Sequence, residues 1–363
     1  MRNFYTVICT LILMAMCSNV LSQTSTAPAS GDGSEGNPYE IADLNNLYWL
    51  SQNSSEWDKH YIQTADIDAS ATSGWDSNQG WTPVGNGTIS FTGGYDGQSH
   101  IIEDLFINRP GENYQGFFGR TNGSSSNSTT IKNLGIVNAS ITANSRVGAL
   151  IGATDQYCLI ENCFSTGAVN ASGQYSGGLI GENYANNEVS NCYSRCSVNS
   201  SSNGAGGLIG LSGNGCTVNN CYSTGAVSGS SGVGGLIGIN TSIVNSSFWD
   251  TQTSGQAASA AGTGKTTAEM KSVATFTDLA TAGLSSAWDF RGYPNDDTGF
   301  DDLWDIETLL NDGYPFLNWQ FASQPSVRMT DIESIGPSTA IINAEVTNDG
   351  GAEITQRGVC WNT

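Results

Sequence analysis

The sequence predicts an all-β protein: a parallel β-solenoid (β-helix) with N- and C-terminal caps that contain short helices, followed by a truncated β-sandwich module. Two observations predict the solenoid. A phrase Gly-(Gly/Ala)-Leu-Ile-Gly recurs with starts 32, 29, 29 and 28 residues apart, and a second phrase, Asn-Cys-(Phe/Tyr)-Ser, lies between its copies. A fixed period of this length is typical of repeat architectures. The copies begin at Gly148, Gly177, Gly206 and Gly234, after a degenerate Gly-Phe-Phe-Gly at Gly116.

Apolar residues also recur at the period of 29. Leu105 is followed by Leu134, Cys163, Cys192 and Cys221, and a second series runs Ile102, Ile131, Ile160, Val189, Val218 and, after a shorter step, Ile243. An unchanged spacing places one apolar position per coil on top of the next, which builds a continuous core in about six coils. We expect Asn108, Asn138, Asn170 and Asn199 near the turns, where Asn tolerates positive φ.

Each phrase contains adjacent Leu and Ile, whose side chains would point to opposite faces of a regular strand. Either one of the two packs outward against another segment, or the flanking glycines bend the chain so that both reach apolar space. The pattern leaves both alternatives open.

The domain organisation follows from changes in composition. We expect a signal peptide at 1–22, a mobile polar tail at 23–30, an N-terminal cap at 31–100, solenoid repeats at 101–246, a C-terminal cap at 247–320 and a partial sandwich module at 321–363. Asp43 is placed to cap a helix carrying Leu44, Leu47 and Leu50. Thr267 is expected to begin a short helix, and 288–290 and 303–306 to form strands. The alternation from Ala340 to Thr347 predicts a sandwich strand, and 38 residues are too few for that domain, so we expect the chain to continue.

The first 22 residues combine Arg2 with an apolar run too short to span a bilayer, as in a secretory signal cleaved before Gln23. The alternative is a lipoprotein signal with Cys17 as the lipidated residue. No other run approaches the length of a transmembrane helix, at least about 18 residues. We expect a secreted or cell-surface bacterial protein.

Charge excludes some partners. The chain carries 33 acids against 12 Lys plus Arg and a formal net charge of −21. Nucleic acids and anionic membrane surfaces both require clustered cations, so neither is an expected partner. Extracellular glycans and host or matrix proteins remain the candidate partners.

Of the nine cysteines, seven follow the signal. Cys163, Cys192 and Cys221 share a repeat column, and neighbouring coils lie ~4.8 Å apart, so a disulfide between adjacent coils is sterically possible. The preferred interpretation is a ladder of buried thiols. The spacings do not match a zinc site.

These repeats, with the phrase at Gly177 and the Asn-Cys-Tyr-Ser-Thr-Gly sequence beginning at Asn220, resemble the GLUG-motif family of bacterial surface and secreted proteins. The resemblance covers about residues 31–320. It implies a repeat fold and an adhesin-like role, and it carries no catalytic residues. The segment from Asp349 to Trp361 resembles the start of an immunoglobulin- or fibronectin-like module.

Catalytic and metal motifs are weak. The acids of the repeats, Asp155, Glu161, Glu182 and Glu188, form no row, and Arg146 and Arg195 are isolated, whereas glycoside hydrolysis needs two facing carboxylates. We therefore expect no enzyme and no cofactor. The acidic stretch 295–302 offers oxygen ligands for Ca²⁺ but does not match a helix–loop–helix calcium loop, and a flexible acidic loop is the simpler interpretation.

Aromatic side chains are the candidate ligand contacts. Tyr157 and Tyr175 could stack on sugar rings, whereas Phe164, Tyr193 and Tyr222 share a column that suits a core ladder. The sequence thus predicts a non-catalytic, adhesin-like or structural display protein. The alternative is a glycan-binding or polysaccharide-degrading β-helix.

Overall fold

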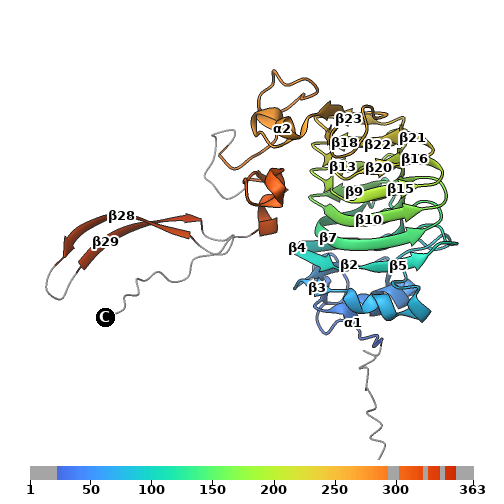
Figure 1. Ribbon diagram of the computed structural model, residues 1–363. Coiled ribbons are helices and arrows are strands. Elements are labelled where there is room, and N and C mark those ends of the chain that lie inside the picture. The colour runs from blue at the N-terminus through green and yellow to red at the C-terminus, as the bar shows by residue number, and fades with distance from the viewer. Residues whose placement is uncertain (1–22, 293–301, 322–325, 336–339, 349–363) are drawn as a thin grey trace, which may run out of the picture.

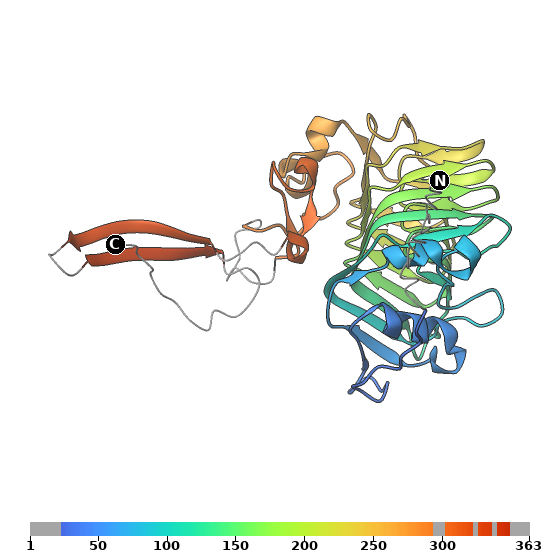
Figure 2. The ribbon, with the colours of Figure 1, turned by 60° about the horizontal axis from the view of Figure 1, so that its bottom comes forward.

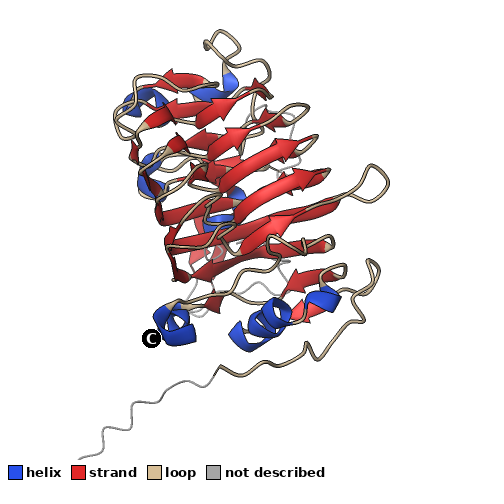
Figure 3. Cartoon of the chain, turned by 90° about the vertical axis from the view of Figure 1, so that its right-hand side faces the viewer, coloured by secondary structure: helices blue, strands red, loops and turns tan. Residues whose placement is uncertain are grey.

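The computed structural model describes residues 23–292, 302–321, 326–335 and 340–348, the last two as backbone strands. The expected signal peptide and all but Asp302 of the stretch 295–302 lie outside these residues. Within them the chain is all-β with few helices, and its largest sheet is a curled parallel sheet of 17 strands. Two smaller parallel sheets, of five and three strands, run beside it (Figures 1 and 3).

The elements before the regular repeats are β1 (Tyr39–Ile41), α1 (Leu44–Gln52), η1 (Ser54–Glu56), β2 (His60–Gln63), β3 (Ile67–Asp68), η2 (Ser70–Gly74), η3 (Asp76–Asn78), β4 (Gly94–Glu103) and β5 (Phe106–Arg109). The repeats contribute β6 (Phe118–Thr121), β7 (Thr129–Ala143), β8 (Ile151–Gln156), β9 (Cys158–Glu161), β10 (Phe164–Ala171), β11 (Ser176–Gly177), β12 (Ile180–Ala185), β13 (Glu188–Ser190), β14 (Tyr193–Ser194), β15 (Ser197–Ser200), β16 (Asn203–Gly206), β17 (Ile209–Ser212), β18 (Thr217–Asn219), β19 (Tyr222–Ser223), β20 (Val227–Ser228), β21 (Ser231–Gly234), β22 (Ile237–Asn240), β23 (Ile243–Asn245) and β24 (Phe248–Asp250). The chain ends with β25 (Thr263–Lys265), α2 (Thr267–Met270), α3 (Ala274–Thr277), β26 (Trp304–Asp305), η4 (Asn311–Gly313), β27 (Phe316–Leu317), η5 (Asn318–Phe321), β28 (Ser326–Ile335) and β29 (Ala340–Asn348).

The spacing of 29 residues is the register of the parallel sheets. Val189 in β13 pairs with Val218 in β18, and Ile180 in β12 pairs with Ile209 in β17. Residues one period apart therefore occupy neighbouring strands, and side chains at one repeat position stack on themselves. The apolar members of these columns are fully buried.

The structure corrects both ends of the apolar columns. Ile131 pairs with Tyr95 and not with Ile102, because the register of β4 against β7 shifts between Asp96 and His100. That shift also separates Leu105 from Leu134: Phe106, the next residue, pairs with Ser140. At the other end Val218 pairs with Val244, while Ile243 is 60% exposed. Counting by 29 fails wherever a bulge or a shortened turn changes the length of a repeat.

The adjacent Leu and Ile of the repeated phrase both enter the core. Leu179 and Ile180 are each fully buried in one apolar cluster, because β12 begins only at Ile180 and the chain bends at the preceding residues. Close backbone packing makes this bend possible. A Cβ on Gly177 would lie 2.0 Å from the carbonyl oxygen of Ile180, so only glycine fits there.

Left-handed corners are filled by a different set of asparagines from the one predicted. All four candidates lie within strands, and only Asn138, in β7, has positive φ. The asparagine before each column cysteine adopts φ 52° instead, and its side chain bonds to its neighbour in the stack, as from Asn162 Nδ2 to Asn133 Oδ1 at 3.1 Å. The column members are Asn133, Asn162, Asn191 and Asn220.

The column cysteines are free, buried thiols, as the preferred interpretation predicted. The backbone N–H of Cys163 donates to Cys192 Sγ at 3.4 Å, and that of Cys221 donates to Ser247 Oγ at 3.1 Å. Ser247 therefore takes the place of the next cysteine, since Tyr222 pairs with Phe248. Ser246 continues the asparagine corner with φ 46°.

The N-terminal segment packs against the first strands as an aromatic and helical unit. Asp43 caps α1 as predicted, since its carboxylate accepts hydrogen bonds from the N–H groups of Asn45 and Asn46, and Leu47 and Leu50 are buried. Figure 1 shows α1 (blue) at one end of the stack. Helix α1 and the aromatic side chains of this segment cover the edges of the first strands, which could otherwise pair with another molecule.

The segment after β25 lies mainly along the side of the stack rather than over its end (orange in Figures 1 and 2). It covers a column of stacked rings, Phe164, Tyr193, Tyr222 and Phe248, with its own aromatic residues. Trp319 packs on Phe164 at 5.6 Å between ring centroids, and Trp304 packs on Tyr193 at 6.2 Å. The core interpretation of this ring column is therefore confirmed.

The predicted strand at 340–347 is present as β29. It pairs antiparallel with β28, a strand that the alternation did not reveal. The expected partner at 354–361 lies outside the described residues, and the sandwich stays a prediction.

Candidate functional site: the outer face of the five-stranded sheet

The five-stranded sheet consists of β6, β8, β12, β17 and β22, and one of its borders carries unusual corner residues. Parallel bridges from Gln115 to Val147, Ser176, Ala205 and Val233 define the register there. The residue before each of these adopts positive φ: Tyr114 61°, Arg146 59°, Tyr175 63°, Gly204 84° and Gly232 56°. Later repeats use glycine, which suits this conformation, whereas the first three use large side chains that it strains.

These three large side chains form a cation–π stack. The Arg146 guanidinium lies 5.2 Å from the centroid of the Tyr114 ring and 5.7 Å from that of Tyr175. Arg146 Nε also donates to Glu182 Oε2 at 2.5 Å. Burial lowers the pKa of Arg146, but its hydrogen bond and charge interaction with Glu182 outweigh that effect and raise it. Arg146 therefore stays cationic, and its guanidinium is held by the two tyrosine rings and by Glu182.

A second ion pair lies beside the stack. Arg120 Nη2 is 2.8 Å from Asp155 Oδ2, and Arg120 Nη1 donates to the carbonyl oxygen of Gly87 at 3.1 Å. The same guanidinium lies 5.7 Å from the Tyr114 ring centroid. Arg120 thus joins the cation–π stack to the groove described next.

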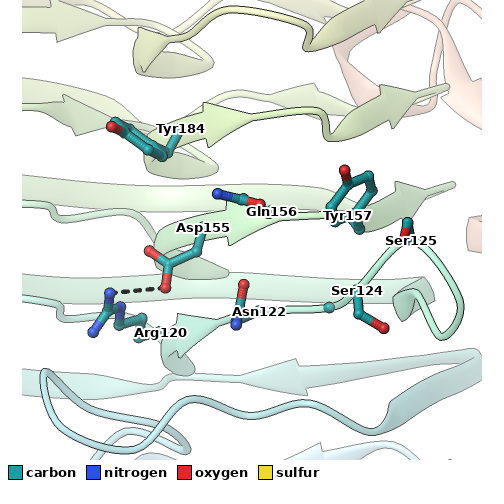
Figure 4. Close-up of a pocket in the computed structure, with 9 residues that line it drawn as sticks. Arg120, Asn122, Ser124, Ser125, Asp155, Gln156, Tyr157 and Tyr184 are labelled. Carbon is teal, nitrogen blue, oxygen red and sulfur yellow. Dashed lines mark ion pairs between the residues drawn. The ribbon is translucent and has the colours of Figure 1, made fainter.

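An open groove of about 450 Å³ lies where β6, β8 and β12 end (Figure 4). Arg120 and Asp155 form one part of its lining, and Tyr157 and Tyr184 lie apart from each other with Gln156 between them. Tyr184 is 54% exposed and Tyr157 is partly exposed. The residues that line the groove are Arg120, Asn122, Gly123, Ser124, Ser125, Asp155, Gln156, Tyr157 and Tyr184.

The groove has a wall because one turn is longer than its successors. Between the paired positions Thr121–Thr154 and Thr129–Cys158, the first repeat has seven residues (122–128) and the next has three (155–157). The extra chain folds back on itself, with Ser124 N–H donating to Asn127 O at 2.9 Å and Asn127 N–H donating to Ser124 O at 3.1 Å. The initial repeat spacing of 32 reflects this insertion.

The structure separates the two predicted ligand contacts. Tyr157 lines the groove, whereas Tyr175 belongs to the cation–π stack at the opposite border of the sheet. Sequence reasoning treated Arg146 and Arg195 as isolated, which is wrong: Arg146 pairs with Glu182, and Arg195 pairs with Asp312. Arg120, Tyr114 and Asp155 were not identified as site residues. The available signals were the long first spacing and the large residues aligned with Gly204 and Gly232.

Among the described residues no group of three or more His, Cys, Asp or Glu side chains is arranged to hold a metal ion. The proposed Ca²⁺ stretch falls almost wholly outside them. Likewise, within the part of the chain that the structure describes, no helix is both long and apolar enough to cross a membrane.

Comparison with known proteins places one repeat in a family. Residues 143–170 match the GLUG motif. Over 132 residues the chain is 39% identical to halomucin from Haloquadratum walsbyi, a stretch covering 36% of this chain and 1% of halomucin. Over 149 residues it is 32% identical to a candidate Gly-rich membrane protein from Evansella cellulosilytica, covering 39% of this chain and 16% of that protein. The chain thus spans a small part of either relative.

A crystal structure from Bacteroides ovatus, named as that of a candidate immunoglobulin A1 protease, superposes with a TM-score of 0.54 at 21% identity. The match covers 80% of this chain and 95% of the other. At this identity the likeness concerns the fold alone. GLUG repeats and the relatives' names are consistent with a surface protein.

Proposed function

We propose that this protein is a non-catalytic, adhesin-like display protein, secreted or held at the cell surface, whose repeats form a parallel β-solenoid. The observation that carries the proposal is the parallel register of the repeats, in which Tyr193 pairs with Tyr222 and Ile180 with Ile209. Such a stack supplies long, regular outer faces without requiring a catalytic centre. The matches to halomucin and to a Gly-rich membrane protein support the surface location.

The acids on the outer face support the non-catalytic role. Asp155 is paired with Arg120, and Glu182 is paired with Arg146, so neither carboxylate is placed to act as a base. The polysaccharide-degrading alternative requires two carboxylates that face each other, and Glu161 is its candidate acid. Burial and then the charge of Glu188 raise the pKa of Glu161, while the charge of Lys132 opposes them.

Export and catalysis can be tested on the full chain. We expect a bacterial host with a secretory pathway to release or display a protein whose N-terminus is Gln23, and mass spectrometry of the extracellular fraction measures this. Retention of an uncleaved chain in the cytoplasm would refute the proposed location. Incubation with a panel of polysaccharides should release no reducing ends; turnover that Glu161→Gln abolishes would establish the degrading alternative instead.

The solenoid itself is tested by removing one period. Deletion of residues 177–205 joins Ser176 to Gly206 in register, because Ser176 pairs with Ala205. Each repeat of a solenoid contacts its neighbours only, so the shortened protein should keep a cooperative unfolding transition and a β-type circular dichroism spectrum. A chain without a cooperative transition would contradict the repeat architecture.

A further inference from the structure

We propose that the groove lined by Arg120, Asn122, Asp155, Gln156, Tyr157 and Tyr184 is a binding site for neutral oligosaccharides. The inference deepens the proposed surface role and rests on it, since it names what the display protein recognises. Four properties of the groove support it: its aromatic side chains, its amides, its charge balance and the strain at one corner.

Aromatic surface is available at two points of the groove. Tyr184 has 54% of its surface exposed, so burial in a core does not account for it. Tyr157 lies between Asn122 and Gln156 on one side and the long turn on the other (Figure 4). An aromatic ring offers an apolar face to the C–H groups of a sugar ring, while its hydroxyl still bonds to water or to a sugar hydroxyl.

The backbone at Tyr157 is strained. In the register of the parallel strands, Cys158 aligns with Asn187 and Cys216. The residues before them, Tyr157, Asn186 and Gly215, therefore occupy the same corner, and their φ angles are 51°, 54° and 74°. Asn and Gly are suited to this left-handed conformation, whereas tyrosine is not. The neighbouring repeats have residues at this corner that adopt positive φ with little strain. A tyrosine in the same conformation therefore points to a role other than folding.

The polar groups of the groove match sugar hydroxyls. Arg120 is held by Asp155 and by the carbonyl oxygen of Gly87, so the ion pair is preorganised. Among the described residues the side-chain amides of Asn122 and Gln156 make no hydrogen bond to the protein. Each amide offers both donors and an acceptor, which is what vicinal hydroxyls require. The lining is mainly polar, with the two tyrosines as its aromatic surface, which suits a ligand rich in hydroxyl groups.

Charge selects neutral glycans. The guanidinium of Arg120 is balanced by Asp155, so the groove has no net positive group to hold a carboxylate or a sulfate. The chain as a whole carries −21, which repels anionic polymers at long range. Binding should therefore depend weakly on salt.

The test is isothermal titration calorimetry of the full chain with cellopentaose, chitopentaose, mannopentaose and maltopentaose, and with a sialylated and a sulfated oligosaccharide for comparison. At least one neutral probe should bind saturably. Tyr184→Ala and Tyr157→Asn should each weaken binding by about tenfold or more, because each removes one stacking ring. Ile243→Ala, a substitution at a 60% exposed residue on β23, is the matched surface control and should leave the affinity unchanged.

Tyr157→Asn separates binding from folding, because Asn is the residue at this corner in the next repeat. It should lose affinity while keeping the melting temperature. Deletion of residues 124–127 reduces the seven-residue turn to three and should also abolish binding. Failure of every neutral probe to bind, or affinities that both tyrosine variants leave unchanged, would overturn the proposal; the export assay would then still decide the surface role on its own.

Discussion

Tyr193 and Tyr222 stack across neighbouring repeats, with ring centroids 4.7 Å apart and planes inclined by 5°. Both hydroxyls donate to the C-terminal segment: that of Tyr193 to Gln320 Oε1 at 2.6 Å, and that of Tyr222 to the carbonyl oxygen of Pro315. The two rings therefore stack in the register of the repeats, while their hydroxyl groups bind the C-terminal segment. The segment is an integral part of the folded unit.

Truncation of this column should destabilise the protein strongly. Tyr222 is fully buried, so Tyr222→Ala should lower the free energy of unfolding by about 3–5 kcal/mol. Tyr222→Phe removes only the hydroxyl bonds to Pro315 and Asn311 and should cost about 1 kcal/mol. Guanidinium unfolding followed by tryptophan fluorescence measures both values. Equal losses for the two variants would show that ring packing contributes little.

The attachment of the C-terminal segment should weaken in acid. Asp250 is buried, and burial raises its pKa, but hydrogen bonds from Tyr314, Thr267 and the N–H groups of Thr253 and Gln252 outweigh this and hold the pKa below 3.8. A lowered folded pKa gives stability that is present above 3.8 and is lost as pH falls through the folded value. Asp250→Asn should therefore be less stable at neutral pH and show a flatter pH dependence below 3.8, as measured by urea unfolding. If the free energies of unfolding of the wild-type protein and of Asp250→Asn fell in parallel with pH, Asp250 would not be the source of the acid sensitivity.

The buried thiols should be inert in the folded protein. Burial raises the pKa of Cys158 to about 12 and that of Cys196 to about 11, and it raises that of Cys192 well above 9.0. Because the thiolate is the reactive form, iodoacetamide should label the six repeat cysteines only after denaturation. Mass spectrometry of folded and unfolded samples reads this directly. Cysteines that resist labelling even after denaturation, until a reductant is added, would indicate disulfides between coils.

The asparagine corners should distinguish conformational from hydrogen-bond effects. Asn191 adopts φ 52° and accepts from Asn220 Nδ2 at 3.3 Å. Asn191→Ala should lower the free energy of unfolding by about 1–2 kcal/mol, since alanine is strained in this conformation. Asn191→Gly relieves that strain and loses only the side-chain bonds, so it should be less destabilising than alanine. The reverse order would mean that the hydrogen-bonded ladder, and not φ, dominates.

The repeated glycines should tolerate no side chain. A Cβ on Gly177 would meet the carbonyl oxygens of Ile180 and Leu208 at 2.0 and 2.7 Å, and neither backbone group can rotate away. Gly177→Ala should lower the free energy of unfolding by about 3 kcal/mol or more, at or above the upper end of ordinary overpacking. Gly36→Ala, at a site with nothing within 4 Å, is the control and should be nearly neutral. A folded and fully stable Gly177→Ala protein would contradict the close backbone packing.

Much of the all-β organisation could be predicted because a repeat of constant length forces equivalent residues into register. The columns through Ile160, Val189 and Val218 needed only counting. The same counting failed at Ile102, because β4 shifts its register against β7, and at Ile243, because Val218 pairs with the next residue, Val244. The Leu–Ile ambiguity likewise needed the bend at Gly178, which is a property of backbone packing.

The sequence by itself determined the period, the β class, the buried thiols and the aromatic core column. Each of these depends on one type of residue recurring at a constant spacing. Only the tertiary structure decided where the C-terminal segment lies and which charges meet. Arg120 and Asp155 are 35 positions apart in the chain, and Arg146 and Glu182 are 36 apart. Parallel stacking brings such pairs together one repeat later, and the long turn at 122–128 forms a groove beside the first of them, Arg120 and Asp155. Those contacts depend on the exact length of each turn, and the average repeat length does not reveal it.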